Sequence, residues 1–197
     1  MVRVFWAGIV AGMVVFAWGA FSHMVLPLGT IGIHSLPDEE AITSAFRHGI
    51  ARPGFYFFPG VADLRGAGKD ERAAAMRAYA EKARRGPTGI LVIQPGGQEM
   101  MTPRLFGAEL LANLLSGLIA ALLVSMAGAG LASLVARVMF VTLLGLFATL
   151  AIEVSYWIWY SFPTSYTLAQ LLDQVSSWFF GGLALGVMLK PKGRSGR

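Results

Sequence analysis

The sequence contains no cysteine and little charge. Without cysteine the chain forms no disulfide, thiolate nucleophile, thiolate metal site or cysteine-linked lipid anchor. Charged residues make up 14% of the 197 residues, whereas a soluble domain is normally about one quarter charged. The sequence also lacks a metalloprotease histidine pair, a nucleophile elbow, a phosphate-binding loop and facing histidines for haem. No enzyme class or cofactor is therefore indicated by motif.

What is present is an apolar chain, 55% hydrophobic with a mean hydropathy of +0.61. Four apolar stretches are each close to the roughly 20 residues that cross a bilayer. They cover residues 4–26, 105–127, 134–157 and 167–189. The fold class predicted is an all-α membrane bundle of four transmembrane helices, with a small α/β extramembrane insertion between helices 1 and 2. The corresponding domains are 1–27, 28–104, 105–189 and a basic tail, 190–197.

Basic residues indicate how the helices are oriented. If the spans alternate, Arg3, Arg137 and the tail lie on one side, which the positive-inside rule places in the cytoplasm. We therefore expect a bacterial inner-membrane protein with both termini cytoplasmic and residues 28–104 outside. Reporter fusions at the C-terminus and near Lys69 would distinguish the two orientations.

The net charge of +5 has the same explanation, because much of it lies in the tail. A basic segment beside a membrane helix is a topology signal or a contact with anionic lipid. Membrane lipids are thus an expected partner, and nucleic acid is not.

The first apolar stretch has an alternative interpretation. Arg3, an apolar run and the small-x-small sequence at 17–19 are typical of a cleavable signal peptide, whose removal would leave three spans. The apolar run continues through 24–26, which favours a retained anchor. The short uncharged connection at 127–130 predicts that the second and third spans form an antiparallel hairpin.

Residues 28–104 show a helix, strand, helix, strand pattern. We expect helices at 38–48 and 69–85 and strands at 55–58 and 89–93. A strand–helix–strand unit can form a right-handed crossover with parallel strands. Because so small a unit is near the limit of independent stability, we expect it to pack on the outer ends of the spans.

The most specific signal is a set of polar residues at similar depth in all four spans. Ionisable residues are rare and costly inside membrane helices, so their alignment predicts one outward-facing polar pocket. Residues three or four apart share a helix face, which groups Glu109 with Asn113. The predicted pocket residues are His23, Glu109, Asn113, Glu153, Asp173 and Gln174.

Part of this pattern has a purely structural explanation. Small residues let membrane helices approach closely, so the glycine pairs 8/12 and 182/186 predict packing contacts. Asp173 lies near a helix start, where the helix dipole stabilises an acid. Glu109 is about one turn inside its span, within reach of headgroup water. Glu153 is harder to explain in this way, because a long apolar run precedes it.

Three kinds of chemistry fit the predicted pocket. Carboxylates and an imidazole can bind a divalent cation. Neighbouring carboxylates can also support protonation chemistry, because like charges disfavour ionisation. Ion pairing with Arg104 or with arginines of the insertion would instead be structural. No spacing selects among these, so catalytic and metal-binding roles stay unassigned.

Three functions follow from these observations. The first is a non-catalytic accessory or scaffold subunit of a larger inner-membrane assembly with protein partners, which fits the small size and the absence of enzyme motifs. The second is a membrane enzyme or metal-handling protein that uses the carboxylate/His pocket. The third is a small transporter, which is disfavoured because no span is broken at mid-depth and no inverted repeat is evident.

Overall fold

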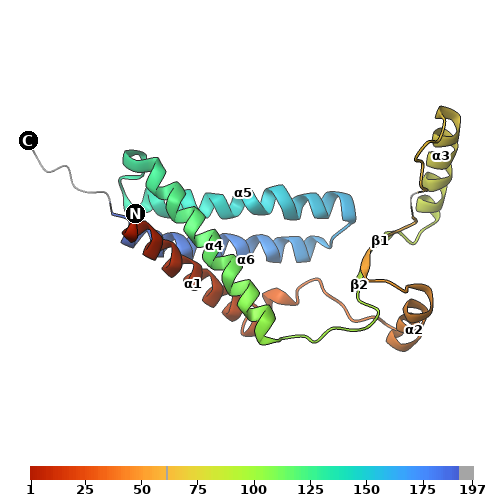
Figure 1. The fold of residues 1–197 in the computed structure, drawn as a ribbon, viewed down its shortest axis with the longest axis horizontal. Helices are drawn as coiled ribbons and strands as arrows, with labels where there is room; N and C mark the ends of the chain where they lie inside the picture. The colour runs from red at the N-terminus through yellow and green to blue at the C-terminus, as the bar shows by residue number, and fades with distance from the viewer. Residues whose placement is uncertain (61, 191–197) are drawn as a thin grey trace, which may run out of the picture. The chain divides into compact units, whose positions relative to one another are not determined.

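The chain folds into two units in this computed structural model, which describes residues 1–60 and 62–190. Unit 1 comprises Met1–Ile33 together with the described residues from Met100 onward, and unit 2 comprises His34–Glu99. Figure 1 shows the helices of unit 1 and the smaller elements of unit 2.

Unit 1 is built from four long helices. They are α1 (Val2–Met24), α4 (Pro103–Ala127), α5 (Leu134–Tyr160) and α6 (Thr164–Met188). Among the described residues these four helices are long and apolar enough to cross a membrane, and they match the four predicted stretches within a few residues. Hydroxyl caps begin two of them, because the Thr102 side chain accepts from the Leu105 N–H and the Ser133 side chain accepts from the Ala136 N–H.

The four helices pack in the order α4, α1, α6, α5. Extensive contacts join α4 to α1, α1 to α6 and α6 to α5, whereas α4 and α5 make little contact. The ribbons of α4 and α5 diverge from the turn that connects them, η2 (Gly128–Leu131) (Figure 1). The predicted α4–α5 hairpin is therefore wrong as a packed pair, because glycine-lined faces direct α4 onto α1 instead.

Close backbone approach holds α4 against α1. A Cβ atom added at Gly117 would lie 2.4 Å from the Gly8 carbonyl oxygen and 2.6 Å from the Gly12 nitrogen. Such separations leave no room for a side chain, so backbone atoms of the two helices touch directly. The predicted packing role of the 8/12 pair is confirmed.

The second glycine pair has the same role between α6 and α5. A Cβ atom at Gly182 would lie 3.1 Å from the Val138 carbonyl oxygen, and one at Gly186 would lie 2.6 Å from Leu134 Cδ1. The buried core of unit 1 is correspondingly made mostly of alanine and valine, with one leucine: Ala7, Ala11, Ala120, Ala121, Val124, Val141 and Leu185. Large apolar side chains lie on the outward faces, with Phe147 71% exposed and Met126 73% exposed. Small residues inside and large apolar residues outside are typical of helices packed in lipid.

Unit 2 has the predicted order of elements, α2 (Glu39–Gly49), β1 (Gly54–Phe58), α3 (Lys69–Arg85) and β2 (Gly89–Ile93). Its two strands are antiparallel, with Gly54 opposite Ile93 and Phe58 opposite Gly89. The expected parallel crossover is therefore wrong. A crossover requires its helix to pack back on the sheet, and α3 makes no substantial contact with either strand.

No described residue between His34 and Glu99 is buried. Both helices of unit 2 lack a buried side chain, and Val92 on β2 is 72% exposed. A two-stranded sheet without a covering layer is marginally stable in water. Unit 2 therefore needs another surface to bury its apolar residues, and docking on the ends of the long helices stays a prediction.

We expect Gly117→Ala to destabilise the protein by about 1–3 kcal/mol, the usual cost of overpacking. The new methyl group would meet backbone atoms of α1, which move only if the whole helix moves. The measurement is thermal unfolding of the full chain in detergent. Gly107→Ala is the matched control, because it lies in the same helix with nothing within 4 Å of its added Cβ. Equal effects of the two substitutions would contradict the close contact.

Candidate functional site

A buried carboxylate lies between α1 and α6. Asp173, on α6, is 5% exposed. Its Oδ1 accepts a hydrogen bond of 2.9 Å from Trp18 Nε1, and its Oδ2 lies 3.1 Å from His23 Nε2. Both partners are on α1, so one side chain of α6 connects two positions on the neighbouring helix.

Packing fixes the two partners of Asp173. The Trp18 ring lies against Phe180 of α6, with centroids 4.7 Å apart. The chain turns back after α1 through η1 (Pro27–Gly29), and a Cβ atom at Gly29 would lie 2.5 Å from His23 Nδ1. Gly29 therefore leaves the space that the imidazole occupies. The His23 side chain is 46% exposed, so this cluster opens to the surface on one side.

The other predicted residue beside Asp173 is Gln174, which is half-buried on the next position of α6. Ser177 lies one turn after Asp173 and is 4% exposed, which continues the polar side of α6 inward. The α1–α6 contact thus contains buried polar side chains of unit 1.

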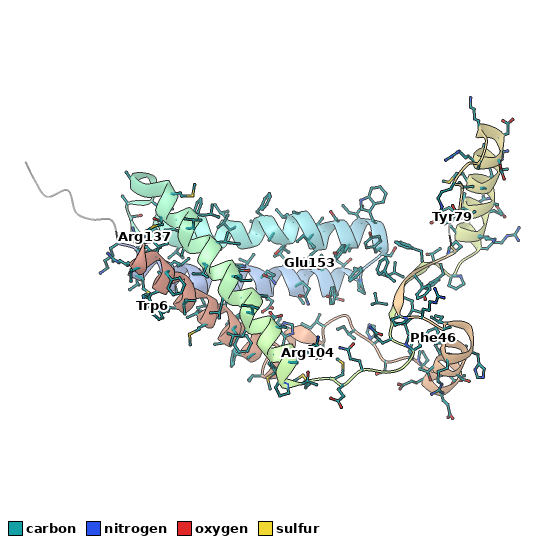
Figure 2. The ribbon with its side chains drawn as sticks, in the orientation of Figure 1. Trp6, Phe46, Tyr79, Arg104, Arg137 and Glu153 are labelled. Carbon is teal, nitrogen blue, oxygen red and sulfur yellow. The ribbon has the colours of Figure 1, made fainter. Side chains whose placement is uncertain are left out.

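Glu153 lies on α5, on the face that packs against α6. It follows buried Thr149 by one turn, and a Cβ atom at nearby Gly145 would lie 2.7 Å from Trp178 of α6. Gly145 of α5 thus lies opposite Trp178 of α6. Because the two helices run antiparallel, Glu153, about two turns after Gly145, lies at the level of Gln170, about two turns before Trp178. Figure 2 shows Glu153 on α5, well away from the turn that joins α4 to α5. Its side chain is half-buried and makes no hydrogen bond within the part of the chain that the structure describes.

The remaining two predicted residues bond to each other on α4. Asn113 Nδ2 donates to the Glu109 carbonyl oxygen at 2.9 Å and to Glu109 Oε1 at 2.8 Å. Glu109 is exposed, and α4 has α1 as its main neighbour. Glu109 and Asn113 therefore form a local pair on one helix.

The structure thus brings together His23 with Asp173 and Glu109 with Asn113. No hydrogen bond or ion pair between the described residues connects these two pairs, or connects Glu153 to either. Across residues 1–60 and 62–190, no three His, Asp or Glu side chains lie close enough to hold a metal ion together. A single pocket lined by all six residues stays a prediction.

Comparisons with known proteins give no match. No family model, curated protein or solved structure matches the chain. A buried carboxylate that accepts from an indole and contacts an imidazole is well suited to joining two helices, since each of its oxygens has a partner on the neighbouring helix.

Two polar contributors were not predicted from the sequence. In the sequence, Trp18 looks like an ordinary apolar residue of its helix. An acid such as Asp173 in an apolar helix does, however, require a hydrogen-bond donor from a neighbouring helix. Arg137 looks like a topology signal, yet it is 4% exposed. Its guanidinium donates to the carbonyl oxygens of Gly186, Leu131 and Ala132. The position of Arg137, one turn inside an apolar helix, could have indicated in the sequence that its side chain is buried.

We expect Trp18→Phe to destabilise the full chain by about 1 kcal/mol, because it keeps an aromatic ring and removes the donor to Asp173. In an Asp173→Ala background the same change should cost much less, because the acceptor is already gone. Thermal unfolding in detergent measures this double-mutant cycle. Trp159→Phe is the control, since Trp159 is 78% exposed. Additive effects of the two substitutions would exclude the interhelical bond.

Proposed function

We propose that this protein is an integral membrane accessory or scaffold protein, a non-catalytic subunit of a larger bacterial inner-membrane assembly. Its four long helices span the membrane with both termini in the cytoplasm, and unit 2 is the extracytoplasmic part that binds a partner protein. The observation that carries this proposal is the absence of any buried residue among the described residues of unit 2.

The composition of unit 2 supports a protein partner. Apolar residues occupy both faces of its two-stranded sheet, since Phe58 and Val92 point to opposite sides and are 41% and 72% exposed. Isolated exposed apolar residues are ordinary, whereas a whole small unit without a core gains stability only by covering such residues. Folding of unit 2 is thereby coupled to binding.

The long helices support a structural role as well. Asp173 and Arg137 are buried, and each is bonded to groups of the same chain. The side-chain amide of Asn113 likewise donates a hydrogen bond to the Glu109 carboxylate. Polar groups that are satisfied in this way stabilise one helix arrangement, and they leave few groups free for catalysis.

A photo-crosslinking residue at position 92 tests the partner proposal in growing cells. We expect a crosslinked product of one defined mass, containing this chain and the same second membrane-associated protein in each repeat. The reason is that Val92 is the most exposed apolar residue of the sheet. The crosslinker at position 82, on the polar helix α3, is the control and should give little of this product.

Two outcomes would refute the proposal. One is crosslinking at position 92 only to the helices of the same chain, which would mean that unit 2 covers its apolar residues within the molecule. The other is equal capture from positions 92 and 82, which would indicate random collisions.

A second candidate function rests on Glu153. It is half-buried without a hydrogen bond to another described residue, and an intramembrane acid of this kind is a candidate for cation or proton handling. This observation supports the membrane enzyme or metal-handling function.

Glu153→Gln separates the second candidate from a structural role, because it keeps the shape of the side chain and removes its charge. A divalent cation at about 100 times its dissociation constant stabilises a protein by about 2.7 kcal/mol. If Glu153 binds the cation, this gain should be largely lost in Glu153→Gln, while unfolding without metal is unchanged or occurs at higher temperature. Glu109→Gln is the control. A loss of stability that is the same with and without metal would instead indicate a structural ion pair.

A further inference from the structure

A cavity of about 430 Å³ lies at the end of unit 1 where α1 and α5 begin and α4 and α6 end. Figure 2 shows Arg137 at this end, near the turn between α4 and α5, and Arg104 at the opposite end of α4. None of the six predicted pocket residues contributes to the cavity. Its lining residues are Arg3, Val4, Val124, Ser125, Gly128, Ala129, Leu131, Arg137, Leu189 and Lys190.

The charges around this cavity are all of one sign. Arg3, Arg137 and Lys190 line it, and its wall contains no acidic residue. None of the three forms an ion pair with any residue between 1 and 190 that the structure describes. Three uncompensated cations around one cavity create a positive potential that an anion would lower.

Arg137 is the most informative of the three. Its Nε donates to the Gly186 carbonyl oxygen at 3.1 Å, and its Nη1 donates to Leu131 and Ala132 at 2.8 and 2.9 Å. Its Nη2 has no acceptor among the described residues. Every fully buried side-chain nitrogen or oxygen of the described residues has a hydrogen-bond partner. Nη2 is therefore not fully buried, and because Arg137 lines the cavity, we infer that its N–H groups are available to a ligand there.

A structural role explains only part of this arrangement. Arg3 donates to the Met188 carbonyl oxygen, and Arg137 donates to that of Gly186, so both satisfy the last carbonyls of α6. That role requires neither Lys190 nor an open cavity. Carbonyl partial charges also compensate a buried guanidinium less completely than an anion does.

The rest of the wall indicates what kind of anion fits. Val4, Val124, Leu131 and Leu189 are apolar, and Ser125 adds a hydroxyl group. The cavity lies among the ends of helices that are apolar enough to cross a membrane. A ligand with a charged head and apolar chains matches both parts of this surface, whereas a free inorganic anion matches only the cationic part.

We propose that this cavity binds the phosphate group of an anionic phospholipid, with Arg3, Arg137 and Lys190 around the phosphate and the acyl chains along the helices. The proposal rests on the membrane insertion proposed above but does not use unit 2. Its failure would leave the partner proposal intact. Basic pockets between helices at the membrane surface are suited to anionic headgroups.

The test uses the full chain in a neutral detergent, titrated with phosphatidylglycerol, with phosphatidylcholine of the same acyl chains, and with inorganic phosphate. Thermal unfolding reports binding. We expect phosphatidylglycerol alone to raise the unfolding temperature substantially at matched concentration. Arg3→Gln and Lys190→Gln should each weaken its apparent affinity by about fivefold, the effect of one basic residue near an anionic surface. Arg104→Gln, at the other end of α4, should not change it.

Salt provides a second readout, since affinity that depends on exposed cations falls as the Debye length shortens. An equal shift with phosphatidylcholine would overturn the proposal, because acyl chains alone would then explain binding. An equal shift with inorganic phosphate would reject the lipid in favour of a free anion. Unchanged affinity in Arg3→Gln and Lys190→Gln, or an equal loss in Arg104→Gln, would show that the phosphate lies elsewhere.

Discussion

The contact between α1 and α6 holds unit 1 together, because it is the main connection between two helix pairs. Glycine-lined faces join α4 to α1 and α5 to α6, where they let the helices of each pair approach closely. Between the pairs, Asp173 accepts from Trp18 and contacts His23. In lipid there is no hydrophobic drive between helices, so contacts of these two kinds determine how the helices assemble.

Buried charge occurs near both ends of this assembly and is satisfied differently at each. Asp173 uses side chains of α1, whereas Arg137 uses main-chain carbonyls, including one of α6. A carboxylate accepts hydrogen bonds and donates none, so Asp173 offers no donor to an anion. A guanidinium has five donors, so Arg137 can serve the helix ends and still present N–H groups to the adjoining cavity. The two ends are therefore chemically unequal, although both anchor the same helix.

The long helices were predictable because apolar length is a local property of the sequence. The glycine pairs were predictable as packing surfaces, but their partners were not. Nothing in Gly8 or Gly12 specifies Gly117, and the short turn after α4 suggested α5 as its neighbour instead. The strands of unit 2 were located correctly, and their antiparallel pairing was missed because a helix between strands normally favours a crossover.

The polar residues illustrate the same limit. Helical spacing identified Glu109 with Asn113, which lie one turn apart. Depth alone suggested that His23 and Asp173 share a site, and the structure places them 3.1 Å apart. Trp18 was missed because nothing in the sequence around a tryptophan in an apolar helix indicates whether its indole N–H forms a hydrogen bond. Glu153 lies at a different contact, between α5 and α6. Which face of a helix meets its neighbour depends on how that helix is rotated about its axis, and packing across the whole unit sets this rotation.

The long sequence separation between α1 and α6 also affects how the protein is made. Trp18 and Asp173 are 155 residues apart in the chain, and His23 and Asp173 are 150 apart. At about 5–20 residues per second, α1 waits roughly 10–30 s in the ribosome-bound chain before its acceptor is synthesised. During that time its indole and imidazole have no carboxylate. Unit 1 is therefore complete only when α6 has been synthesised. A chain that ends before α6 leaves the Trp18 indole and the His23 imidazole without their partner, and cellular quality control can recognise these unpaired groups.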